Sequence, residues 1–127
     1  MYAKDYTITT ETGRKLSLCE AGQADGAPVL VQHGTPSSRL LSPSWVEDAS
    51  SRGIRLISYD RPGYGDSTSQ PGRSVASAAA DVAAIAKALG LPRLGIWGVS
   101  GGGPHALACA ALLAELSRQE TGLQFVE

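Results

Sequence analysis

The feature that most constrains the fold is the stretch GVSGG at residues 98–102, which lies between two apolar segments. The short run at 94–97 is typical of a buried strand, and residues 104–116 predict a helix that is apolar on nearly every side. A strand that passes directly into a helix needs small residues where the two elements approach. Glycines stand two positions before and two positions after Ser100. The stretch therefore predicts a sharp strand–turn–helix unit that presents Ser100.

The pattern G-x-S-x-G in this context is typical of a nucleophile elbow. The strained turn would hold the Ser100 hydroxyl above the sheet, and the Gly101 N–H at the helix start would point toward an oxyanion formed on an acyl carbon. A simpler interpretation is a glycine-rich turn with a capping serine, but the flanking strand and helix favour the elbow. A nucleotide-binding turn does not fit, because the glycines do not follow G-x-G-x-x-G and the lysine of a phosphate loop is missing.

The rest of the chain predicts a layered α/β arrangement. Residues 6–10 and 15–19 alternate in the manner of an antiparallel hairpin. The elements expected after it are a buried strand at 28–32, a short helix at 45–52, a strand at 54–59 and a helix at 75–89, capped by Ser74 and ended by Gly90. Residues 123–126 fit either one more strand or a loose tail. We expect a mixed, mostly parallel sheet with an N-terminal antiparallel hairpin, in a single domain over residues 1–127.

Composition narrows the classes of function. The chain has 127 residues, 43% of them hydrophobic, with 11 basic and 12 acidic residues and a net charge of −1. This balance gives no reason to expect nucleic acid or an anionic membrane, so a small neutral substrate or a protein partner is expected. The first residues do not resemble a signal peptide and no apolar run approaches the ~20 residues of a membrane helix, which favours the cytoplasm. Two cysteines, Cys19 and Cys109, fit buried thiols, and no cofactor or metal is predicted.

Three segments resemble the α/β-hydrolase superfamily, particularly its epoxide-hydrolase, haloperoxidase–esterase and proline-iminopeptidase-like members. They are HGTP at 33–36, DRPGYGDS at 60–67 and GVSGGGPHA at 98–106. The resemblance extends to about residue 114. It implies that Thr35 supplies a second oxyanion N–H, since proline at the next position has none. It also implies that Asp60 is structural, and the serine at the elbow argues against members that use an aspartate there.

The same resemblance places the acid and the histidine of a triad on loops after later strands, so we expect a fold truncated after about strand five or six, the N-terminal half of the full one. His105 lies five residues after Ser100 on the same helix, which turns it away from the nucleophile. In the family's sheet order the third strand lies beside the fifth, so His33 is expected near Ser100. A surrogate-base role for His33 is the less favoured interpretation, and support of the oxyanion loop is the favoured one.

Two hypotheses of function follow. The first is a serine hydrolase scaffold for ester or related acyl substrates, with weak activity because the acid and histidine are missing. The second is a catalytically inactive half-fold that self-associates or pairs with a complementary chain. Central strands that become edges invite such pairing, so a homo-oligomer through an exposed sheet edge is expected.

Overall fold

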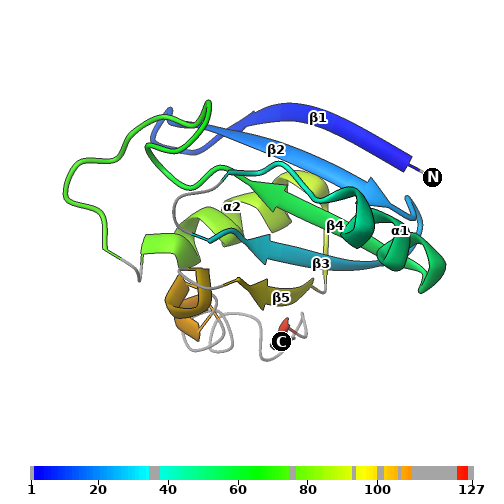
Figure 1. The fold of residues 1–127 in the computed structure, drawn as a ribbon. Helices are drawn as coiled ribbons and strands as arrows, with labels where there is room; N and C mark the ends of the chain where they lie inside the picture. Colours follow the sequence, from blue (N-terminus) through cyan, green and yellow to red (C-terminus); the bar gives the residue numbers. More distant parts are fainter. Residues whose placement is uncertain are drawn as a thin grey trace.

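The fold is a six-stranded mixed sheet with helices on both faces (Figure 1). The computed structural model describes residues 2–34, 38–74, 77–92, 94–99, 102–105, 107–109 and 123–125. The strand order is β1-β2-β4-β3-β5-β6, which confirms the predicted α/β class. The bounds are β1 Tyr2–Thr9, β2 Lys15–Gly22, β3 Ala27–Gln32, α1 Pro43–Ser51, β4 Ile54–Tyr59, α2 Ala78–Leu89, β5 Leu94–Gly98 and β6 Leu123–Phe125.

The predicted N-terminal hairpin is present. β1 pairs with β2 antiparallel, and β2 pairs with β4 antiparallel. The hairpin turn is closed by the Thr10 N–H, which donates to the Arg14 carbonyl at 2.8 Å, and Gly13 takes a φ of 85° inside it. β2 runs on to Gly22, beyond the predicted residue 19, because its second edge pairs with β4 there.

The centre of the sheet is parallel and buried on both faces. β3 pairs with β4 on one side and with β5 on the other, which confirms the expected neighbourhood of the third and fifth strands. Leu30 and Ile57 point into the core under α2, whereas Val31 and Leu56 point into the smaller core under α1. This explains the continuous apolar runs, since a strand covered on both faces has no polar side.

The helices differ from the sequence prediction mainly at their first turns. α1 begins at Pro43, two residues earlier than predicted, because proline at the first position already has a helical φ and needs no N–H partner. α2 begins at Ala78 rather than directly after Ser74. The Ser74 N–H instead donates to Ser77 Oγ at 3.0 Å, and the Ser77 N–H donates to the Ser74 carbonyl. Gly90 ends α2 in a left-handed conformation, as expected.

The described residues after β5 form part of a helix and the last strand of the sheet. Residues 103–105 and 107–109 are helical, and the rest of the helix predicted over 104–116 lies outside the described residues. Residues 123–125 form β6, which runs parallel to β5. Of the two interpretations left open for this segment, the strand is therefore the right one for these three residues.

Candidate functional site: the switch point between β3 and β5

The topology selects one place for a site. Along the chain, β3 is followed by β4 on one side of it in the sheet, whereas β5 is followed by β6 on the other side. The sheet order therefore reverses between β3 and β5, and Figure 1 shows β4 and β5 on opposite sides of β3. Ligands of open α/β sheets bind at such a switch point, outside the carboxyl ends of the strands. The predicted nucleophile and oxyanion segments both begin at these two strand ends.

Ser100, Gly101 and Thr35 lie outside the described residues, but the residues that flank them are placed. The Val99 N–H donates to the carbonyl of Gln32 at 3.0 Å, which ties the end of β5 to the end of β3. The Gly102 N–H donates to the Val99 carbonyl at 2.8 Å. The two residues on either side of the Ser100–Gly101 pair are thus hydrogen-bonded to each other and fastened to β3.

Gly102 has a steric reason to be glycine. A Cβ at this position would overlap the Gln32 carbonyl oxygen and would come within 2.6 Å of the His33 carbonyl oxygen. Both are backbone atoms, which cannot turn aside. Gly103, the next residue, has open space where its Cβ would be. Of these two described glycines, Gly102 alone is required by the close approach of the helix start to β3.

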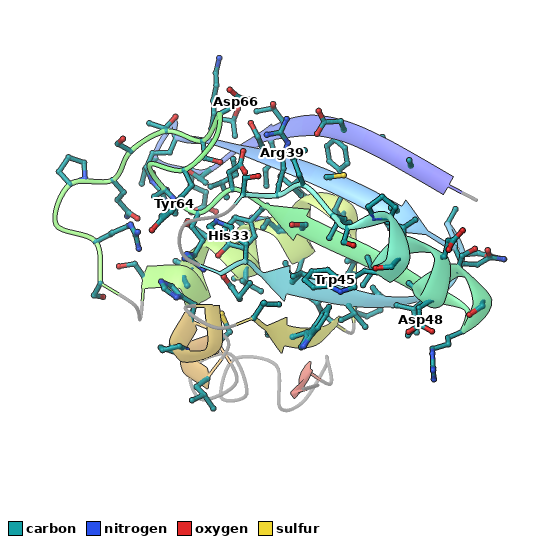
Figure 2. The ribbon with its side chains drawn as sticks, viewed as in Figure 1. His33, Arg39, Trp45, Asp48, Tyr64 and Asp66 are labelled. Carbon is teal, nitrogen blue, oxygen red and sulfur yellow. The ribbon has the colours of Figure 1, made fainter. Side chains whose placement is uncertain are left out.

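His33 follows β3 and its ring is buried. Nε2 accepts the backbone N–H of Arg61 at 3.1 Å, and Nδ1 lies 2.7 Å from the Gly34 carbonyl oxygen. Since Nε2 accepts a hydrogen bond, Nδ1 carries the proton and donates to that carbonyl. Burial lowers the pKa of His33, in keeping with a neutral ring, although the bond to Gly34 opposes this shift. Figure 2 shows the ring beside Tyr64, with 4.9 Å between the two ring centroids.

These bonds bear on the role of His33. A general base needs a ring nitrogen that can take a proton from the nucleophile. In His33 one nitrogen already carries a proton and the other already accepts a backbone N–H. The geometry therefore favours the structural role, in which the ring holds the chain next to Thr35. His105 is on the other side of the sheet, where it lines a narrow space with Tyr59 and Asp81.

Asp60 organises the loop after β4. Its side chain is fully buried and accepts hydrogen bonds from the backbone N–H groups of Arg39 at 2.6 Å and Asp66 at 3.0 Å. Gly65, at a φ of 49°, leaves the room that the carboxylate fills, because a Cβ there would overlap it. The Ser67 hydroxyl is also used, since it accepts the Ser17 N–H. This loop is structural, as the sequence resemblance implied for Asp60.

Arg39 joins three parts of the molecule, a role that the sequence did not reveal. Its guanidinium binds Asp60 through Nη1 at 2.7 Å and Asp5 on β1 through Nε at 2.8 Å and Nη2 at 3.1 Å. Figure 2 shows Arg39 near Asp66 over this end of the sheet. The hydrogen bond from Arg39 lowers the pKa of Asp5, although burial opposes it. The ion pairs fasten the segment that follows Thr35 to β1 and to the loop after β4.

Gln32 is a second residue that the sequence analysis missed. It is the last residue of β3 and is fully buried. Its Oε1 accepts the Tyr59 hydroxyl at 3.0 Å, and its Nε2 lies 3.6 Å from Cys109 Sγ. A glutamine that ends an apolar strand directly before His-Gly was the available signal. Cys109 is buried as expected, whereas Cys19 is half-buried, and burial raises the pKa of both thiols.

A cavity of about 400 Å³ opens beside the switch point on the α1 face. Val99 and Gly34, which directly precede Ser100 and Thr35, both line it. A larger groove of about 640 Å³ lies between the hairpin turn and α2, away from these strand ends. Within the described ranges no cluster of three or more histidine, cysteine or acidic side chains could hold a metal ion. Helices in the same ranges are too short or too polar to cross a membrane.

The chain resembles known proteins over most of its length. A family model described as alpha/beta hydrolase fold matches residues 27–116. The non-heme chloroperoxidase of Streptomyces lividans is 39% identical over 90 residues, which cover 67% of this chain and 31% of that protein.

Solved structures give the same result. A candidate aryl esterase from Burkholderia cenocepacia has a TM-score of 0.72 and 30% identity, over 96% of this chain and 46% of its own length. An epoxide hydrolase from an endophytic Streptomyces has a TM-score of 0.71 and 26% identity, over 97% of this chain and 36% of its own. The chain therefore spans less than half the length of each of these three proteins.

Proposed function

Because the chain belongs to the α/β-hydrolase-fold family, we propose that it carries the nucleophile of a serine hydrolase that acts on small, uncharged esters or related acyl compounds. Ser100 Oγ attacks the acyl carbon and loses its proton to a base, and the alcohol leaves with a proton. Water then cleaves the acyl-enzyme, which releases the acid and restores the serine hydroxyl. The esterase among the similar structures has an activity of this class by its name.

The observation that carries the proposal is the frame around residues 100 and 101. Val99 is bonded to Gln32, Gly102 is bonded to Val99, and Gly102 has no room for a side chain. A nucleophile elbow needs this close approach of helix and strand, whereas a simple capping turn does not. In this proposal the Gly101 N–H is the first oxyanion donor, at the start of the helix.

The contacts of His33 support Thr35 as the second donor. A planar trans peptide holds its C=O and its N–H on opposite sides. The His33 ring binds the Gly34 carbonyl at 2.7 Å and is itself bonded to the Arg61 N–H. Fixing this carbonyl fixes the plane of the peptide unit to which the Thr35 N–H belongs. We therefore propose His33 as a positioning residue for the oxyanion hole, and we do not propose it as the base.

The test is hydrolysis of a short-chain nitrophenyl ester by wild-type protein, Ser100→Ala and Ser44→Ala. Ser44 is an exposed serine near the start of α1, so its variant is a matched control. We expect slow nitrophenolate release that is lost in Ser100→Ala and kept in Ser44→Ala, because only Ser100 supplies the oxygen that attacks the ester. Equal release by wild-type protein and Ser100→Ala would refute the proposal.

A second proposal concerns assembly. β6 is the last strand of the described sheet and has only three described residues, and it pairs with β5 on one side. A strand at the edge of a sheet leaves backbone N–H and C=O groups that a second chain can pair with. We propose that copies of the chain, or a complementary chain, associate along this edge. Light scattering across a wide concentration range should give a mass above that of the monomer, and a stable monomer at every concentration would contradict it.

A further inference from the structure

The cavity on the α1 face contains a buried hydroxyl that no described residue satisfies. Ser58 lies on β4 with 1% of its surface exposed, and its Oγ has no hydrogen-bond partner among the described groups. The residue lines the cavity. Buried polar groups nearly always have a partner, and one without a protein partner indicates a place for a bound molecule. Ser58 therefore marks the inner part of the cavity as a binding position.

The strand register gives the depth of Ser58 below the carboxyl ends of the strands. Val31 is opposite Ser58 in the β3–β4 register and opposite Trp97 in the β3–β5 register. Val99 is two residues beyond Trp97, at the level of the strand ends. With a rise of about 3.3 Å per residue, Ser58 lies about 6.6 Å below that level. An extended chain of five or six bonds covers this distance, at roughly 1.2 Å per bond.

The described walls specify an uncharged occupant with apolar parts. Leu41, Trp45 and Val99 supply apolar surface, and Ser38 and Ser42 add hydroxyls. None of the described residues that line the cavity is an aspartate, glutamate, lysine or arginine. His33, which also lines it, is neutral by its hydrogen bonds. A charged ligand would lose its hydration without gaining a counter-charge. A volume of about 400 Å³ is near the lower end of the range for small-molecule sites.

We propose that this cavity binds the acyl chain of the substrate, and that Ser58 selects chains that carry an uncharged oxygen several bonds from the reacting carbon. The proposal rests on the proposed function, since it takes the cavity mouth at Val99 and Gly34 as the side from which the acyl carbon is attacked. The Ser58 hydroxyl can donate to a ketone, ether or ester oxygen or accept from a hydroxyl. Substrates with oxygenated chains are thereby preferred over plain aliphatic ones.

The test uses binding rather than turnover, in Ser100→Ala protein, so that its outcome does not depend on acylation. The probes are heptanone, a linear methyl ketone that cannot be hydrolysed, and heptanedione, which has a second ketone toward its far end. The readout is the indole N–H signal of Trp45 in NMR titrations. The chain has two tryptophans, and their rings lie 4.7 Å apart, so Trp97→Phe assigns the signals.

We expect both ketones to shift the Trp45 signal in a saturable manner, with heptanedione binding more tightly. Ser58→Ala should weaken heptanedione about fivefold and leave heptanone unchanged, as for the loss of one hydrogen bond. Leu41→Phe should weaken both by filling the cavity. Ala84→Phe, in the groove beside α2, is the matched control and should change neither.

Three results would overturn the inference: no saturable shift of the Trp45 signal with either ketone, an unchanged preference for heptanedione in Ser58→Ala, or equal effects of Leu41→Phe and Ala84→Phe. Thermal melts of each variant establish that it is folded. Failure of the proposed function is seen separately, as ester hydrolysis that does not depend on Ser100. If the ketones bind but ester hydrolysis does not depend on Ser100, the proposed role of the cavity stands. Only the proposal that Ser100 is the nucleophile is then refuted.

Discussion

At the scale of single residues, Gly102 is where the frame of the site is least tolerant of change. Gly102→Ala places a methyl group against the Gln32 and His33 carbonyl oxygens, so it should lower the free energy of unfolding by about 3 kcal/mol or more. Gly103→Ala meets open space in a helix and should raise it by about 0.5–1 kcal/mol. Urea denaturation of both variants measures this contrast. Similar values for the two would mean that the helix does not approach β3 so closely.

Ser58 should show the opposite behaviour, because its hydroxyl is buried without a partner among the described residues. Removing an unsatisfied buried hydroxyl relieves its desolvation cost. Ser58→Ala should therefore raise the free energy of unfolding by about 1 kcal/mol, measured by urea denaturation in the absence of ligand. A loss of stability of the same size would mean that the hydroxyl makes a bond in the folded protein, and that the cavity has no unfilled binding position.

At the scale of elements, Arg39 is the main fastening between the segment after Thr35 and its surroundings. Arg39→Ala leaves Asp60 buried without its counter-charge, and breaking a buried pair costs about 3–5 kcal/mol. Arg52→Ala is the matched control, since Arg52 pairs with Asp48 on the exposed face of α1 and such pairs contribute at most about 0.5 kcal/mol. Thermal or urea unfolding separates the two. A small loss for Arg39→Ala would show that the loop after β4 holds its shape without it.

The same elements show how much of the fold could be predicted from the sequence. The order of strands and helices could be predicted because apolar runs and glycine positions report burial and turns locally. Arg39 and its partner Asp5 could not, since 34 positions separate them in the chain and only the packing of β1 against the loops brings them together. The start of α2 also differed from the pattern, because hydrogen bonds between Ser74 and Ser77 close a separate turn before Ala78. For the site, Gly102 and His33 were visible as motif residues, whereas Ser58 looked like an ordinary strand position. The signal at Gln32 was a polar residue at the end of an apolar strand, and it does not reveal the partners of its side chain.

At the scale of the whole molecule, stability should fall as the pH drops below about 6.5. Burial lowers the pKa of His33 below its usual value of about 6.5, so in the interval between the two pKa values the unfolded chain binds more protons than the folded one. The loss begins near the unfolded pKa and is complete below the folded one. His33→Gln keeps a donor and an acceptor but does not titrate. Urea midpoints between neutral and mildly acidic pH should therefore have a smaller slope in this variant, and an unchanged slope would contradict the assignment.

A separate loss is expected at lower pH. Burial raises the pKa of Glu20, but hydrogen bonds from Arg55 and Tyr6 outweigh it and the net shift is downward. The pKa of Asp5 is also lowered. Both carboxylates contribute stability above their unfolded pKa values, near 4, and lose it as the pH falls through the folded ones. Glu20→Gln should therefore weaken the dependence of the urea midpoint on pH in this acidic range alone. The slope attributed to His33 should stay unchanged.

The central claim is that the fold presents Ser100 as a nucleophile, and covalent labelling tests it most directly. Wild-type protein, Ser100→Ala and Ser44→Ala would be exposed to a fluorophosphonate, and the adduct would be located by peptide mass spectrometry. We predict slow labelling of the wild type and of Ser44→Ala on Ser100, with none in Ser100→Ala. Labelling of other serines at the same rate, or a Ser100 that stays unmodified after prolonged exposure, would contradict the claim.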